Sequence, residues 1–211
     1  RAASAEERQA LQRYTGWGGL PRSFNLDTDE PAWAERARHL QDLLPAEDYA
    51  SARVSVNNSH YTEIHVIEAM WQAICGFGFT GGRVLEPAAG IGHFIGAMPE
   101  NPAEHSTVTA IEIDRLSGRI LQALYGAAGV DARVAPFEKT PLPENWFDLV
   151  TGNVPFGKYH VADQSHPAYA HYYLLPVAGT SANLQPRRAF IHCMLISAFA
   201  SATISGPRRR P

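Results

Sequence analysis

Short apolar runs and stretches of helical period alternate along the middle of the chain, from residue 58 to about residue 160. The apolar runs at 83–86, 107–112, 130–134 and 147–151 predict four strands. Between the first three strands lie stretches of helical spacing. Strand, helix, strand, helix in this order predicts an α/β fold with a doubly wound, mainly parallel sheet. Ligands of such sheets bind beyond the carboxyl ends of the strands.

Two longer helices flank the first strands. The first is expected to be capped by Thr62 and to end at Gly76, and the second to follow the strand at 107–112. A short helix stopped by Pro99 lies between them. The apolar face of the first is expected to hold Ile64, Ile67, Met70 or Trp71, and Ile74, and that of the second Ile113, Leu116, Ile120 and Leu124.

The segments on either side of this core differ in pattern. Residues 1–57 predict a helical leader, with helices over Ala2–Tyr14 and Pro31–Leu44 separated by a glycine-rich break at 15–21. Residues 58–175 form the predicted core. Residues 176–211 lose the periodicity and end in a basic, proline-rich stretch, which is typical of a solvated or disordered tail.

Composition narrows the classes of function. The chain has 211 residues, a net charge of −3 and a calculated pI near 6.3, so no overall positive field draws it to nucleic acid. Its two cysteines lack the spacing of a metal site or a disulfide framework, and we expect no metal site. No apolar run is long enough to span a membrane and no signal peptide is evident, which favours a cytoplasmic location. The first residue is arginine, so we interpret the chain as a fragment of a longer protein.

A glycine loop directly follows the first strand, in the sequence EPAAGIGHF from Glu86 to Phe94. Gly90 and Gly92 allow a sharp turn and a close approach of ligand to backbone. The third glycine of a dinucleotide fingerprint is absent, and Glu86 would repel a pyrophosphate. Glu112 ends the next strand, where a carboxylate can accept both ribose hydroxyls. Together these residues predict a cofactor with a ribose and a positive charge, which fits S-adenosylmethionine; an ordinary turn is the alternative.

A second loop, GNVPFG, follows the fourth strand. The Asn153 side chain and the Val154 carbonyl could bind the two hydrogens of an exocyclic amino group, while Pro155 fixes the direction of that carbonyl. Phe156 could stack on a flipped base. The prediction is a positioning and electrostatic role for Asn153, because asparagine is not a base at neutral pH. A simple turn is the alternative.

These two loops resemble those of the amino-methylating, S-adenosylmethionine-dependent methyltransferases. Their order, with His60-Tyr61-Thr62 ahead of the glycine loop, resembles the adenine-specific DNA methylases. The segment YTGWGGL at 14–20, followed by Phe24, resembles the leader of phage and mobile-element proteins that join such a methylase to a helicase. The resemblance implies a Rossmann-like class I methyltransferase fold and transfer of a methyl group to adenine in DNA. It also implies a flipped target adenine and further domains such as a helicase. The cofactor residues it implies are Tyr61, Thr62, Glu86, Ala88, Gly90, Gly92, Glu112, Ile113, Phe137 and Asn153, and the catalytic ones Asn153, Val154, Pro155 and Phe156.

Departures from the family pattern leave other functions open. Val154 replaces a proline, Pro136 stands where relatives have an acidic residue, and residues 176–211 do not match the family, so we expect a sheet that is incomplete at its C-terminal edge. The alternatives are a non-catalytic remnant that binds cofactor or DNA, and an amino methyltransferase that acts on protein glutamine or RNA guanine. The histidines, His93 among them, lack paired metal-ligand spacing and are expected at the surface or at caps.

Overall fold

In the part of the chain that the structure describes, the strands form a four-stranded, all-parallel sheet with the order β3-β2-β1-β4. A computed structural model describes residues 3–56, 59, 61–143 and 146–153. The strands are β1 (Gly82–Glu86), β2 (Ser106–Glu112), β3 (Asp131–Val134) and β4 (Leu149–Val150). The prediction of an α/β fold with a parallel sheet is therefore confirmed.

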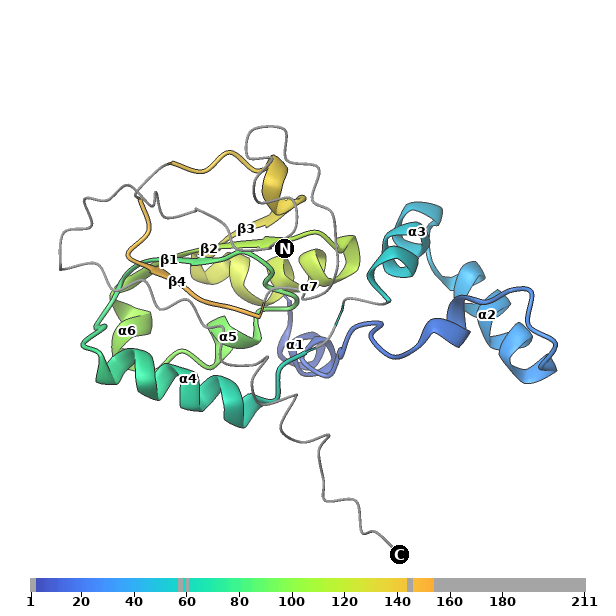
Figure 1. Cartoon of the computed structure of the whole chain (residues 1–211), viewed down its shortest axis with the longest axis horizontal. Coiled ribbons are helices and arrows are strands. Elements are labelled where there is room, and N and C mark those ends of the chain that lie inside the picture. The colour runs from blue at the N-terminus through green and yellow to red at the C-terminus, as the bar shows by residue number, and fades with distance from the viewer. Residues whose placement is uncertain (1–2, 57–58, 60, 144–145, 154–211) are drawn as a thin grey trace, which may run out of the picture.

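Seven helices occur in the described part of the chain, together with three short 3-10 segments. The helices are α1 (Ala5–Leu11), α2 (Pro31–Leu43), α3 (Ala46–Ser55), α4 (Ile64–Gly76), α5 (His93–Gly96), α6 (Glu100–Glu104) and α7 (Arg115–Tyr125). The 3-10 segments are η1 (Pro21–Phe24), η2 (Gly126–Ala128) and η3 (Phe137–Lys139). Figure 1 shows α4, α5 and α6 on one side of the sheet, and α2 and α3 standing beyond it.

Side chains alternate between the two faces of each strand, so each face has its own core. Val84 and Leu149 pack with the buried face of α4, and Ala110 packs with α7 through Leu121. Leu85 and Ile111 point to the opposite face, where Phe147, Phe137 and Leu142 cover them. In the described residues the longer helices therefore cover one face, and a 3-10 segment and loops cover the other.

The first residues of two helices differ from the sequence prediction. Helix α4 has Glu63 at its N-cap, without a side-chain cap among the described residues, so the prediction that Thr62 caps this helix is wrong. Helix α7 begins only after Asp114, whose carboxylate accepts a hydrogen bond from the Ser117 N–H. Ile113 precedes this cap and is 60% exposed, so it does not belong to the inner face of the helix.

The α2 and α3 helices form a small core of their own. Phe24, Tyr49, Ala52 and Val56 are buried together, with Trp17, Leu40 and Leu44 packed around them. The α2 helix was predicted with nearly the observed bounds, whereas α3 was not predicted as an element. In contrast, α1 packs on the main domain, where Leu11 and Tyr14 contact the cluster of Ile91, Ile120 and Leu124.

Gly118 brings α7 close to the edge strand β3. A Cβ at this position would lie 2.6 Å from Cγ2 of Val134, a stiff β-branched side chain. We expect Gly118→Ala to lower the free energy of unfolding by about 1 kcal/mol, because overpacking costs ~1–3 kcal/mol and exceeds the helix propensity gained. Urea denaturation followed by circular dichroism measures the effect.

Gly126 provides the matched control for Gly118. It ends the same helix with φ −58°, and a Cβ added there would meet no heavy atom of the described residues within 4 Å. Gly126→Ala should leave stability unchanged or raise it by about 0.4–1 kcal/mol. Equal effects of the two substitutions would contradict close packing of α7 on β3.

Candidate functional site

A cavity of about 520 Å³ lies at the carboxyl edge of the sheet. It is lined by residues that follow each of the four strands: Pro87 after β1, Ile113 after β2, Ala135 after β3 and Asn153 after β4. Parallel strands place these segments on one edge, and β1 lies between β2 and β4, where the strand order reverses. The size is typical of a pocket for a small molecule.

The cavity brings together most of the predicted cofactor residues. All of them except Gly92 line it, namely Tyr61, Thr62, Glu86, Ala88, Gly90, Glu112, Ile113, Phe137 and Asn153. Val154, Pro155 and Phe156, the remaining residues of the predicted amino-binding loop, lie outside the described residues. The predicted tail at 176–211 also lies outside them.

Gly92 does not line the cavity and lies where the glycine loop meets α7. It is the N-cap of α5 with φ +89°, and a Cβ there would lie 2.7 Å from the Tyr125 ring and 2.8 Å from Leu121. The left-handed backbone and the close approach of α7 both favour glycine. The second glycine of the loop therefore packs the turn against α7.

Gly90 and Glu112 are joined directly. The Gly90 N–H donates to Glu112 Oε2 at 2.7 Å, and the Asp114 N–H donates to Glu112 Oε1 at 2.7 Å. Gly90 adopts φ +56°, a left-handed backbone conformation that favours glycine. Both carboxylate oxygens thus accept a backbone hydrogen bond, and the carboxylate retains acceptor capacity for a ligand hydroxyl.

Glu86 lies on the same sheet face as Glu112, because its register partner Ala110 is two residues before Glu112. Glu86 is 2% exposed, and its Oε2 has no hydrogen-bond partner among the described residues. Burial, reinforced by the charge of Glu112, raises the pKa of Glu86 well above its ordinary value. Burial also raises the pKa of Glu112, but the backbone N–H groups of Asp114 and Gly90 oppose that rise.

The two carboxyl groups therefore differ in their chemistry. Glu112 has the donors that stabilise an anion, whereas Glu86 has none at Oε2 in the described structure and is the group that more readily keeps a proton. A cation in the cavity would favour ionisation of both groups. Thr62 Oγ1 is a further buried atom of the cavity lining that no described residue hydrogen-bonds, so the site can bind polar groups as well as charge.

Aromatic side chains form one wall of the cavity. The Tyr61 and His93 rings meet edge to face with centroids 5.0 Å apart, and both residues line the cavity. His93 is half-buried, and burial lowers its pKa, which favours the neutral ring. His93, which was expected at the surface or at a cap, is the first residue of α5 and lies partly buried in the cavity wall. Burial raises the pKa of Tyr61, so its hydroxyl stays protonated at neutral pH.

Helix α3 supplies a wall that the sequence did not predict. Ala50, Ser51, Val54 and Ser55 line the cavity. The segment AEDYASARVS has no strong apolar stripe, so its pattern gave no signal of a site. Within the described residues, no group of three or more histidine, cysteine, aspartate or glutamate side chains could hold a metal ion.

The chain has a similar protein in a bacteriophage. No protein family model and no solved structure matches the chain. The chain is similar to "Defense against restriction protein B" of Escherichia phage P1, with 31% identity over 154 residues, which is 72% of this chain. The match spans 5% of the length of the phage protein.

This relative corrects the functional prediction. Its name describes defence against restriction and gives no methylase activity, so the identification as an adenine-specific DNA methyltransferase is contradicted. The associated assignments of enzyme class and DNA methylation are wrong with it. The prediction rested on the resemblance of two short loops, one of which departs from the methylase pattern at Val154. No helix in the described part of the chain is long and apolar enough to cross a membrane.

Proposed function

We propose that this domain binds S-adenosylmethionine, as a ligand-binding module of a longer protein that acts in defence against restriction. The observation that carries the proposal is the pair of buried carboxyl groups, Glu86 and Glu112, lining one cavity at the carboxyl edge of a parallel sheet. S-adenosylmethionine supplies a sulfonium and an ammonium cation together with a ribose. Two carboxyl groups disfavour ligands that place phosphates there.

The arrangement of the site supports this ligand in two further ways. The order β3-β2-β1-β4 is that of the first four strands of a Rossmann-like sheet, which binds nucleosides at this edge. Glu112 retains acceptor capacity for ribose hydroxyls, and Glu86 Oε2 and Thr62 Oγ1 offer further polar contacts. Ile113 and Phe137 supply apolar surface for a purine ring.

The context of restriction defence comes from the name of the phage relative. DNA is the target of restriction, and it is therefore the macromolecular partner that we propose for the longer protein. This chain has a net charge of −3, so we expect other parts of the longer protein to make most of the contacts with DNA.

Calorimetric titration of the purified chain tests the ligand. We expect binding of S-adenosylmethionine and much weaker binding of ATP, whose phosphates meet the two carboxyl groups. Glu112→Gln should weaken S-adenosylmethionine binding by about 10-fold or more, because an amide nitrogen cannot accept from the Gly90 or Asp114 N–H.

Glu104→Gln is the control for this titration. Glu104 ends α6 on the surface, does not line the cavity and precedes β2, at the opposite edge of the sheet. Its substitution removes the same charge and should leave the affinity unchanged. A folded wild-type chain that fails to bind S-adenosylmethionine would refute the proposal.

A further inference from the structure

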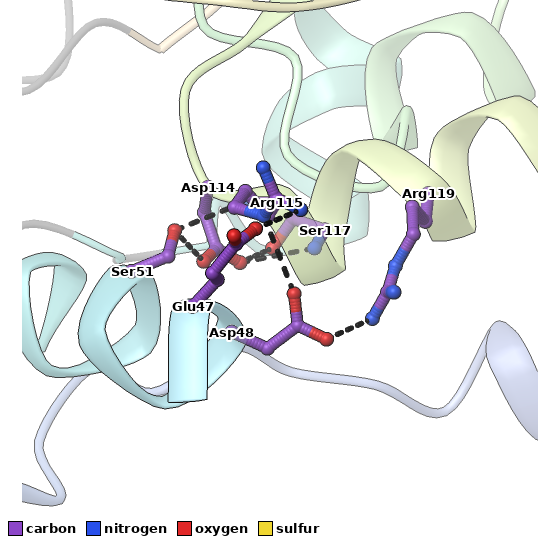
Figure 2. Close-up of polar contacts among 7 residues, drawn as sticks. All are labelled: Glu47, Asp48, Ser51, Asp114, Arg115, Ser117 and Arg119. Atoms are coloured by element: carbon purple, nitrogen blue, oxygen red, sulfur yellow. Dashed lines mark hydrogen bonds and ion pairs between the residues drawn. The ribbon is translucent and has the colours of Figure 1, made fainter. Parts of the chain in front are cut away.

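The contact between α3 and α7 is polar, whereas the α2–α3 cluster and the clusters of the sheet are apolar. In the described structure, the buried apolar residues of α3, Tyr49 and Ala52, lie in one cluster with Phe24 and Val56, and this cluster shares no buried residue with the clusters of the sheet. Between α3 and α7, hydrogen bonds and ion pairs form the junction (Figure 2). A polar junction between two separately packed units can open at smaller cost than an apolar core.

Asp48 is the centre of this junction. Its side chain is 2% exposed, and it forms ion pairs with Arg115 and Arg119 of α7 (Figure 2). Glu47 pairs with the same Arg115 at 2.8 Å but is largely exposed. Buried, doubly paired carboxylates are sensitive to the loss of a partner, whereas exposed pairs contribute little. Among the charged residues of this junction, Asp48 is therefore the one whose loss we expect to weaken the contact between α3 and α7 most.

A chain of hydrogen bonds leads from this junction to the glycine loop. The Ser51 hydroxyl donates to Asp114 Oδ1 at 3.0 Å and accepts from the Arg115 N–H at 3.1 Å (Figure 2). The Asp114 N–H donates to Glu112, which in turn accepts from the Gly90 N–H. Ser51 of α3 is thus connected to Glu112 through Asp114.

The same helix lines the cavity. Val54 of α3 and Ile113, which follows β2, both line the cavity and are large apolar side chains exposed to solvent, by 75% and 60%. Exposed apolar side chains at the mouth of a cavity lose contact with water when an apolar ring is bound between or beside them. A ligand that contacts both would hold α3 on the main domain.

From these observations, and resting on the proposed ligand, we propose that α3 is the closing wall of the S-adenosylmethionine site and that Asp48 is its positioning residue. Docking of α3 on α7 and binding of the ligand then stabilise each other. By linkage, a variant that undocks α3 loses affinity, and the ligand in turn protects α3.

The test compares Asp48→Asn with wild type in the full chain. We expect the Kd for S-adenosylmethionine to rise about tenfold, within the usual range of coupling between sites. Arg119→Gln should act on the same contact, so the double variant should be less than additive. Hydrogen exchange gives the second readout: ligand should slow exchange in α3 of the wild type, and much less in Asp48→Asn.

Glu30→Gln is the matched control. Glu30 pairs with Arg22 inside the leader at 3.4 Å, and both side chains are exposed. This variant removes an ion pair and a charge from the leader without touching α7, so Kd and ligand protection should stay at wild-type values.

Two outcomes separate the inference from the proposed function. Binding of S-adenosylmethionine by wild type with an unchanged Kd in Asp48→Asn would overturn the role of α3 and leave the ligand assignment standing. Failure of the wild type to bind would refute both. A higher Kd in Asp48→Asn with wild-type exchange protection of α3 would also overturn the inference, because the loss of affinity would then not be caused by undocking of α3.

Discussion

Glu86→Gln is expected to stabilise the ligand-free protein at neutral pH and to weaken its binding of a cationic ligand. Glu86 is buried, and its Oε2 has no hydrogen-bond partner in the described structure, so ionisation must place an unsolvated charge beside Glu112. Glutamine has nearly the shape of the protonated acid and does not ionise. The substitution therefore removes the energetic cost of burying that charge, and it also removes the attraction of the charge for a cationic ligand.

The sign of the pH dependence follows from the raised pKa of Glu86. Its ordinary value is 4.5. Below that pH the group is protonated in both folded and unfolded chains and contributes its full stability. As the pH rises from 4.5 through the folded pKa, the unfolded chain ionises first and stability is lost, by up to ~1.4 kcal/mol per pH unit. Above the folded pKa the loss is complete and constant.

Urea denaturation of wild type and Glu86→Gln across this pH range measures the effect. The two free energies of unfolding should differ by a constant below pH 4.5 and diverge in favour of the variant as the pH rises. Glu104→Gln should show no such divergence, since Glu104 is exposed. Parallel pH profiles for wild type and Glu86→Gln would contradict a buried carboxyl group that resists ionisation.

Bound S-adenosylmethionine should make wild type more stable than Glu86→Gln, which reverses the order of their free energies of unfolding. A cation beside Glu86 favours the ionised carboxylate, so wild type should release a proton on binding S-adenosylmethionine while Glu86→Gln releases less. Calorimetry in two buffers of different ionisation enthalpy counts that proton. A residue that destabilises the free protein and favours the bound one is typical of a binding site.

Much of the sheet and its edge could be predicted from the sequence. The apolar runs at 83–86 and 107–112 are strands because both faces are buried, and parallel order then puts Glu86 and Glu112 on one edge. Ile113 was misplaced because the apolar period continued through it, whereas Asp114 caps the helix one residue later. A local side-chain cap thus overrode the hydrophobic pattern.

The wall formed by α3 could not be predicted, for a different reason. Asp48 is buried only because Arg115 and Arg119, more than sixty residues away, neutralise it. No pattern within residues 46–55 records those partners. Likewise, the hydrogen bonds from the Gly90 and Asp114 N–H groups to Glu112 depend on the loop conformation, and the spacing of residue types does not predict them.

Trp71→Ala is expected to cause the largest loss of stability, about 3–5 kcal/mol, as is usual for a large aromatic residue removed from a core. Trp71 is 1% exposed in α4 and packs in the cluster with Ile67 and Ile74. Its indole N–H also donates to the Phe94 carbonyl at 2.9 Å. Urea denaturation measures the loss, and Trp146→Ala is the control, because Trp146 is 50% exposed.

Trp71→Ala should also affect the shape of the cavity. Phe94, whose carbonyl Trp71 binds, lines the cavity and lies in α5, directly after the glycine loop. Trp71→Phe separates the two roles of the indole: it keeps most of the apolar packing and removes the hydrogen bond, at a cost of ~1–3 kcal/mol for the carbonyl left without a partner. If the bond positions the loop, Trp71→Phe lowers affinity for S-adenosylmethionine although the chain stays folded. If only packing matters, Trp71→Phe binds as wild type does, and the indole hydrogen bond has no role in positioning the glycine loop.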